Sequence, residues 1–203
     1  MKRNLVVLLL ASIAAFPISA MAADQGGRSD TLDPLPAEAR IGQGDWDARI
    51  SASVGLATGT IIFPYSTSNP SGPGYCFDLQ TILPIYKGLA AVVGLNSIVF
   101  DIASTTNSYF DFMGGLGYVL KFGVFVPFAE AKGGFTFGDE SGSESWNGVG
   151  ASLCYDVGFN LDLGKNFILG LKYQNTNAWI SVQKVSGTTV NISSFFLSAG
   201  LRF

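Results

Sequence analysis

Apolar and polar residues alternate at a period of two through most of this chain. The clearest run covers residues 148–163, where the odd positions are apolar and the even positions are polar or small: Val149, Ala151, Leu153, Tyr155, Val157, Phe159, Leu161 and Leu163, against Gly148, Gly150, Ser152, Cys154, Asp156, Gly158, Asn160 and Asp162. Successive side chains of a β-strand point to opposite faces of the sheet. The run therefore predicts a strand with one apolar and one polar face.

Similar alternation predicts eight strands. They cover residues 46–57, 75–85, 88–100, 107–120, 124–137, 147–163, 167–180 and 190–203. The third is the least regular, because Ala90, Val92 and Ile98 interrupt its polar face. Each segment has at least about ten residues, which is enough for a tilted strand to cross a bilayer.

The connections between these segments alternate in length. Short links, PIYKG, KFG and LGKN, follow the even strands, while longer or more polar segments follow the odd ones: TGTIIFPYSTSNPSGPG, DIASTTN, GDESGSESWN and SVQKVSGTT. Short turns at one end and long loops at the other are typical of outer-membrane barrels with an even strand number. We therefore predict an all-β fold over residues 45–203, an eight-stranded antiparallel up-and-down transmembrane β-barrel. Both chain ends would be periplasmic and the loops extracellular.

A soluble lipocalin-like barrel would also have eight up-and-down strands, with its apolar face turned inward. Residue size distinguishes the two, because an eight-stranded barrel has an interior only just wide enough for side chains to fill. Here the polar face is the small one, with Gly148, Gly150, Ser152 and Ser198, whereas the apolar face carries Phe, Leu, Tyr and Trp. This favours apolar side chains that face lipid. Aromatic girdles are expected at the turn end and the loop end: Trp46, Tyr86, Tyr118, Phe125, Phe167 and Phe203, and Phe110, Phe135 and Trp179.

The N-terminus has the pattern of an export signal. Lys2 and Arg3 precede the apolar run LVVLLLASIAAF, and SAMAA then offers small residues for cleavage. A membrane anchor is the alternative, but the dozen residues from Leu5 to Phe16 fall short of the about 20 that span a bilayer. We predict a signal peptide over 1–22 and a polar, flexible segment over 23–44.

Together these features resemble the small eight-stranded outer-membrane β-barrel family, which includes the OmpA-type transmembrane domain, OmpX-like proteins and opacity-type surface proteins. The terminal strand carries the signature at alternate positions: Phe195, Leu197, Ala199, Leu201 and Phe203. The resemblance implies that these residues form a C-terminal assembly signal read by the barrel-assembly machinery, a transient partner. No peptidoglycan-binding domain follows the barrel segments, so tethering to the cell wall is not implied.

Charged residues on the polar face are expected inside the barrel. The proposed lumen charge layer consists of Arg49, Asp78, Glu130, Lys132, Asp156 and Lys172, with Asp111 also inward and with Asp47, Asp162 and Arg202 near the periplasmic end. Buried charges must form ion pairs or hydrogen bonds, because their desolvation costs several kcal/mol, on the order of magnitude of a whole protein's stability. A structural polar core is the preferred interpretation, and a narrow passive pore for small solutes or ions is the alternative.

Other functional classes are less consistent with the composition. The net charge of −3 and the lack of a basic patch argue against nucleic acid as a partner. The chain has no histidine, which excludes Ser-His-Asp and other histidine-based chemistry, so we expect no enzyme activity and no cofactor or metal. Cys76 and Cys154 would lie on opposite walls of the barrel, too far apart for a disulfide, and are predicted to be reduced and buried.

The expected role is structural or one of cell-surface interaction, such as adhesion, host contact or envelope integrity, through the extracellular loops. Besides outer-membrane lipid, the partner would be an extracellular ligand or host surface that the loop composition does not specify. We expect a monomer.

Overall fold

The computed structural model describes residues 47–63, 69–102, 105–141, 146–164, 166–182 and 185–203. The predicted signal peptide (1–22), the polar segment (23–44) and Trp46 lie outside the described residues. In the described part of the chain, no helix is long and apolar enough to cross a membrane.

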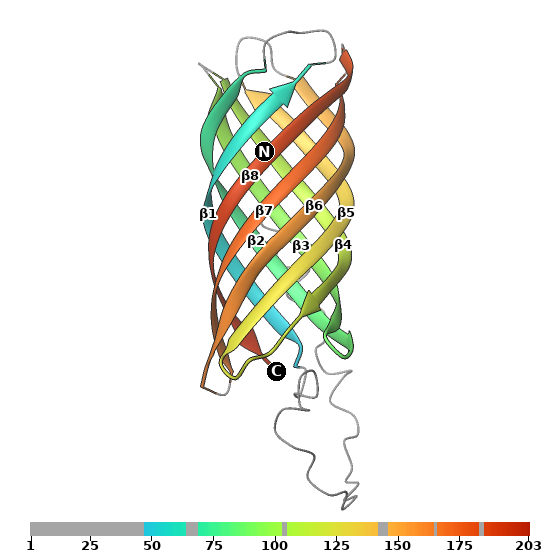
Figure 1. Cartoon of the computed structure of the whole chain (residues 1–203). Helices are drawn as coiled ribbons and strands as arrows, with labels where there is room; N and C mark the ends of the chain where they lie inside the picture. The colour runs from blue at the N-terminus through green and yellow to red at the C-terminus, as the bar shows by residue number, and fades with distance from the viewer. Residues whose placement is uncertain (1–46, 64–68, 103–104, 142–145, 165, 183–184) are drawn as a thin grey trace, which may run out of the picture. The chain divides into compact units, whose positions relative to one another are not determined.

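Eight strands form one closed sheet (Figure 1). They are β1 (Arg49–Ile62), β2 (Ser71–Tyr86), β3 (Leu89–Ile102), β4 (Thr105–Val119), β5 (Phe125–Ser141), β6 (Trp146–Leu163), β7 (Phe167–Val182) and β8 (Val185–Arg202). Each strand pairs antiparallel with the next, and β1 closes the barrel on β8. The predicted fold class, an eight-stranded antiparallel up-and-down barrel, is confirmed.

The pairing register fixes the inclination of the strands. Followed strand by strand around the barrel, the pairings lead from Arg49 through Ile82, Val92, Gly115, Lys132, Cys154, Thr176 and Ile192 to Gly59, ten residues further along β1. A stagger of this kind requires the strands to tilt by about 35–45° from the barrel axis. Figure 1 shows the strands winding obliquely in this way.

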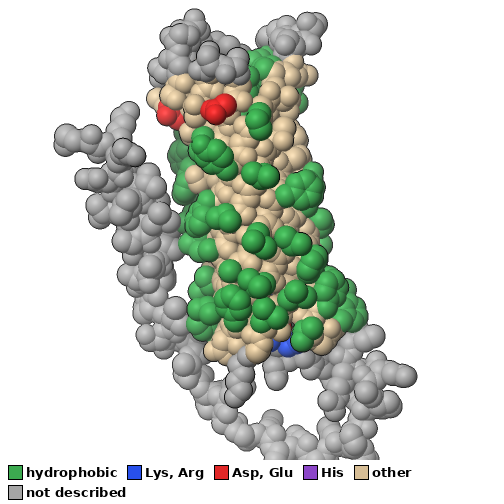
Figure 2. Space-filling model, turned by 90° about the vertical axis from the view of Figure 1, so that its left-hand side faces the viewer, with side chains coloured by type: hydrophobic (Ala, Val, Ile, Leu, Met, Phe, Trp, Pro, Cys, Tyr) green, Lys and Arg blue, Asp and Glu red, His purple; other side chains and the backbone are tan. Residues whose placement is uncertain are grey.

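The alternation in sequence becomes an outward and an inward face. On β6, Tyr155 and Val157 are exposed while Cys154 and Asp156 are buried. Figure 2 shows hydrophobic side chains along the wall, with acidic side chains near the loop end and basic ones at the opposite end. Because exposed apolar residues cover the outer wall, this face suits lipid rather than water.

The inward face is less polar than its glycine and serine residues suggested. Buried apolar side chains gather in two places inside the barrel. The loop-side apolar cluster consists of Ala57, Ile61, Cys76, Ile98, Phe100, Tyr109, Ala178, Ile180, Val190, Ile192 and Phe196. The turn-side apolar cluster consists of Ile82, Ala90, Val92, Val119, Val126 and Phe128. The lumen is therefore layered.

The β2–β3 turn at the chain-end side is tight, as predicted. Lys87 and Gly88 both have positive φ, 41° and 92°, which is the backbone of a two-residue type I′ hairpin turn. At the loop side the prediction needs correction. β3 and β4 pair as far as Ile102 and Thr105, and β7 and β8 as far as Val182 and Val185, so most of DIASTTN and SVQKVSGTT is strand. Polar residues remain compatible with strand pairing where both faces meet water.

Candidate functional site

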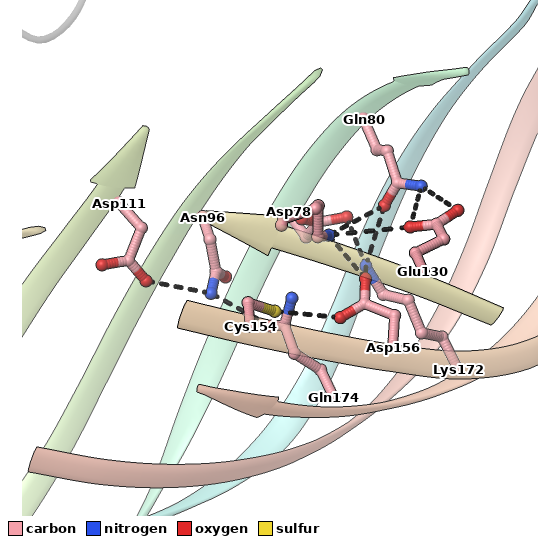
Figure 3. Close-up of polar contacts among 10 residues, drawn as sticks. Asp78, Gln80, Asn96, Asp111, Glu130, Cys154, Asp156, Lys172 and Gln174 are labelled. Carbon is pink, nitrogen blue, oxygen red and sulfur yellow. Dashed lines mark hydrogen bonds and ion pairs between the residues drawn. The ribbon is translucent and has the colours of Figure 1, made fainter. Parts of the chain in front are cut away.

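A buried network of charged and amide side chains occupies the lumen between the two apolar clusters (Figure 3). Its residues come from four of the eight strands: Asp78 and Gln80 on β2, Glu130 and Lys132 on β5, Asp156 on β6, and Lys172 on β7. Each exposes 5% or less of its surface. We call this set the charge network.

Two lysines sit at the centre of the charge network. Lys172 Nζ lies 2.7 Å from Asp78 Oδ2 and 3.4 Å from Asp156 Oδ2. Lys132 Nζ lies 2.5 Å from the same Asp156 oxygen and 3.8 Å from Glu130 Oε2. The structure thus brings together the five mid-barrel charges of the expected layer. Asp156 bridges the two ammonium groups and so reduces their mutual repulsion.

Gln80 completes the contacts of this group. Its Nε2 donates to both carboxylate oxygens of Glu130 at 2.7 Å, while its Oε1 accepts from Lys132 at 3.4 Å and Lys172 at 3.3 Å. An amide suits this place because it presents donors at one atom and an acceptor at the other. Glu130, which lies further from lysine than Asp156 does, is therefore held chiefly by a neutral donor.

A second group of polar side chains extends the network toward the loop side. Asn96 Nδ2 donates to Gln174 Oε1 at 3.0 Å and to Asp111 Oδ2 at 3.4 Å. Thr136 Oγ1 donates to the other oxygen of Asp111 at 2.5 Å. Asp111 therefore receives hydrogen bonds from neutral groups, and Figure 3 shows Asn96 between it and Gln174.

Sequence analysis missed the neutral members of this interior: Gln80, Asn96, Thr136 and Gln174. The sequence did contain a signal for two of them. Gln80 follows Asp78 by two residues and Gln174 follows Lys172 by two, so each shares the inward face of a charge that was recognised. A search for buried charges alone overlooks the amides that satisfy them.

Arg49 does not join the charge network, contrary to its grouping with the lumen charge layer. It is the first residue of β1 and pairs with Arg202 at the end of β8. There its guanidinium lies 3.4 Å from Asp162 Oδ1. Arg202 contacts Asp162 at 2.7 Å and Asp47 at 3.2 Å. These four residues, which we call the rim cluster, lie at the turn end. The sequence pattern showed that Arg49 faces inward, but it did not show how high along the barrel Arg49 lies.

The two cysteines are free and buried. Cys76 belongs to the loop-side apolar cluster, whereas Cys154 Sγ donates to Asp156 Oδ1 at 3.0 Å. Among the residues that the structure describes, no three Cys, Asp or Glu side chains are arranged to hold a metal ion. The polar contacts that the geometry of this interior shows are ion pairs and hydrogen bonds, as between Lys172 and Asp78 and between Gln80 and Glu130.

The C-terminal signature residues lie on the outward face of β8. Phe195, Leu197 and Leu201 are 68%, 59% and 49% exposed, and Ala199 shares their face. Phe203 follows the strand, and its N–H donates to the carbonyl oxygen of Ala48 at 3.0 Å. These positions are accessible from outside the barrel, as recognition by another protein requires. The assembly role itself stays a prediction.

Three solved structures that are similar to this chain span bacterial surface and outer-membrane proteins. Neisserial surface protein A matches with a TM-score of 0.60 at 13% identity, over 76% of this chain and 97% of that one. Ail of Yersinia pestis, the attachment invasion locus protein, matches with a TM-score of 0.48 at 18% identity, over 78% and 100%. The outer membrane protease OmpT of Escherichia coli has a TM-score of 0.45 at 7% identity, over 77% and 96%. No protein-family model and no curated protein matches the sequence.

The resemblance to Neisserial surface protein A and the lipid-compatible outer wall agree on the class of protein. The chain is an eight-stranded antiparallel β-barrel of the type found in small outer-membrane proteins. At this level of identity the likeness concerns the fold, and the role of the barrel has to be argued from its own residues.

Proposed function

We propose that this chain is an outer-membrane barrel with a closed lumen, which serves as a rigid anchor for a surface that contacts partners outside the cell. In this arrangement the loop end is extracellular and both chain ends are periplasmic. The barrel acts as a monomer, inserted with the help of the assembly machinery, and has no catalytic activity. The layered filling of the lumen is the observation that carries this proposal.

Four sets of side chains, which we call layers, fill the lumen from the loop end to the turn end: the loop-side apolar cluster, the charge network, the turn-side apolar cluster on β2 to β5, and the rim cluster. The last two overlap in height, because Ile82 is paired with Arg49. To leave toward the loop end, an ion held in the charge network would have to cross the loop-side apolar cluster, and toward the turn end it would have to pass the turn-side apolar cluster and the buried Asn160 beside it. On the loop side it would meet Ile98 and Phe100, and on the turn side Val126, each no more than 1% exposed. Moving an ion into apolar surroundings costs several kcal/mol, roughly the net stability of a small domain. The layers therefore act against a passive pore.

The charge network is better explained as an internal brace. Its ion pairs and amide hydrogen bonds link β2 to β5 and to β7 across the lumen, between strands that are not neighbours in the sheet. Such cross-barrel contacts hold opposite walls at a fixed separation. A narrow passive pore, the alternative that the sequence allowed, would require these cross-lumen contacts of the charge network to break.

The surface role is supported by the polar edge that the strands form at the loop end. Paired strands continue there through Asp101 on β3 and through Asp139 and Glu140 on β5. Asp101 accepts a hydrogen bond from Thr106 Oγ1 at 2.8 Å, which fixes its side chain at this edge. The described residues at this end include no Lys or Arg. A partner with a basic surface fits this charge pattern.

Two experiments test the proposal separately. Purified protein in planar bilayers should give no stable unitary currents, and such currents would refute the closed lumen. Cells that lack the protein should adhere less to host cells than wild-type cells. Restoration of adhesion by the wild-type gene, but not by a D139N/E140Q gene, is the expected result. Equal adhesion of all strains would refute the surface role and leave the closed lumen standing.

A further inference from the structure

The outer wall carries a row of polar side chains where β7 meets β8. Asn175 and Asn177 on β7 and Asn191 and Ser193 on β8 all lie on the outward face and are half-buried. Hydrogen bonds connect them in a continuous chain. Asn191 Nδ2 donates to Asn177 Oδ1 at 2.8 Å, Asn177 Nδ2 donates to Asn175 Oδ1 at 3.1 Å, and Asn175 Nδ2 donates to Ser193 Oγ at 3.1 Å. We call these four residues the amide ladder.

The amide ladder stands at a depth where the rest of the wall is apolar. Along β7 it lies between Leu171 and Trp179, both about half exposed, and Trp179 belongs to the loop-side girdle. On the neighbouring β6, Asn177 is paired with Leu153 and Asn175 with Tyr155. Polar side chains that face hydrocarbon are costly unless a partner satisfies them. The ladder therefore calls for a partner with hydrogen-bonding groups at the loop-side boundary of the apolar band.

The hydrogen bonds within the ladder leave it rich in donors. Each asparagine amide has two N–H donors, and the bonds of the ladder use one of each. Ser193 Oγ accepts from both Asn175 and the Tyr173 hydroxyl, so its own O–H is available. A complementary partner would offer acceptors without donors, which is the chemistry of an ester carbonyl.

An apolar groove of about 540 Å³ adjoins the ladder on the side of the turn end. Four adjacent strands line it, with the outward residues Val54, Leu56, Val157, Leu171, Phe195 and Leu197 among them. Tyr173 belongs to both features, because its ring lines the groove and its hydroxyl lies 3.3 Å from Ser193 Oγ.

Charge narrows the choice of lipid. The described residues of β6, β7, β8 and β1 place no charged side chain on their outward face. Lys and Arg are the usual partners of lipid phosphate groups. A polyanionic glycolipid bound here would find no counter-charge on these described strand residues, whereas the neutral ester linkage of a zwitterionic phospholipid needs none.

We propose that the groove and the amide ladder form a binding site for a diacyl glycerophospholipid. One acyl chain lies in the groove, and its ester carbonyl accepts hydrogen bonds from the ladder. The lipid's acyl chain is thus held by apolar contact along the groove and by hydrogen bonding at its ester end. This inference rests on one part of the proposed function, that the outer wall of the barrel faces lipid. It does not depend on whether the lumen conducts ions.

The test compares two lipids that differ only in the linkage. Folded protein is released from micelles containing dioleoyl phosphatidylethanolamine or its diether analogue, and retained lipid is measured by native mass spectrometry. We expect the diester to be retained about tenfold more strongly than the diether, the equivalent of one or two hydrogen bonds. The double variant N175L/N177L should bind both lipids alike and weakly. The control S97L replaces an outward serine on β3, away from the groove, and should behave as wild type.

Three outcomes would overturn the proposal. Equal retention of diester and diether by the wild type would remove the role of the carbonyl. Unchanged selectivity in N175L/N177L would remove the role of the ladder. A wild-type dimer that N175L/N177L abolishes would assign this face to a second copy of the chain. Folding of each variant is checked by the mobility shift on unheated gels. Stable unitary currents from the wild-type protein in a planar bilayer would contradict the closed lumen but would leave the proposed lipid site unaffected.

Discussion

Two valines on β6 allow the membrane-facing wall to be tested at two depths. Val157 and Val149 are both outward and both 53% exposed, so replacing either by arginine changes the same side chain at the same accessibility. β6 ends at Leu163, and Val157 lies six residues and Val149 fourteen residues from that end. Any difference between the two substitutions must therefore come from their height in the wall.

The register gives the two heights. With a rise of about 3.3 Å per residue and a tilt of about 40°, Val157 stands about 15 Å above the end of β6 and Val149 about 35 Å. The apolar band of an outer-membrane barrel is about 25 Å tall. Val157 therefore lies well inside the band and Val149 beyond it. Arginine on the lipid face costs about 2–4 kcal/mol near the midplane and about 0–1 kcal/mol near the interface.

We expect V157R to destabilise the barrel by about 2–4 kcal/mol and V149R by less than about 1 kcal/mol. Reversible unfolding of the barrel in phospholipid vesicles by guanidinium, followed by tryptophan fluorescence, measures both values. V157K serves as a second cation with a different shape. Equal costs for V157R and V149R would show that depth has no effect, and the assignment of this wall to lipid would then be wrong.

Further predictions concern the interior, the wall contacts and the terminal strand. K172A should destabilise the barrel by about 3–5 kcal/mol, since it leaves Asp78 and Asp156 without their shared cation, while the double variant D78L/K172M should be closer to wild type in the same unfolding assay. G134A should cost about 1–3 kcal/mol because the added methyl group would overlap the backbone oxygen of Phe112, whereas G133A, with its nearest neighbour 3.7 Å away, should cost less than about 1 kcal/mol. F203S should lower the amount of folded protein in the outer membrane, measured by immunoblotting of membrane fractions, but leave refolding into detergent micelles unchanged; a refolding defect of similar size would instead indicate a structural role for the side chain. Equal costs for the two glycine variants would contradict the register of β4 on β5.

The strand number and the two faces were readable from the sequence because membrane strands must keep a strict period of two. Residues 148–163 show this best, since the alternation from Val149 to Leu163 matches one strand, β6. The irregular third segment was also informative. Ala90 and Val92 belong to the turn-side apolar cluster and Ile98 to the loop-side cluster. The residues that interrupted the polar face of this segment are those that form the apolar layers of the lumen.

Height and pairing were less accessible to sequence analysis. Inward parity grouped Arg49 with Lys132 and Lys172, although the stagger of the barrel places it in the rim cluster. Polar runs such as DIASTTN were assigned to loops, because composition does not distinguish a loop from a strand that continues into water. The amide ladder requires β7 and β8 to be aligned, since Asn177 and Asn191 are fourteen residues apart in sequence and face each other only through the register.

Single-channel recording in a planar bilayer tests the central claim, a lumen closed by alternating apolar and charged layers. Wild-type protein, refolded to a single folded band and added at increasing concentration, should produce no stable unitary currents in symmetric salt. An F100A/I180A variant, which removes large side chains from the loop-side cluster, serves as a positive control for leakage. Steady unitary currents from the wild type that change in amplitude in E130A or K132A would show that ions pass through the charge network, and they would contradict the closed barrel.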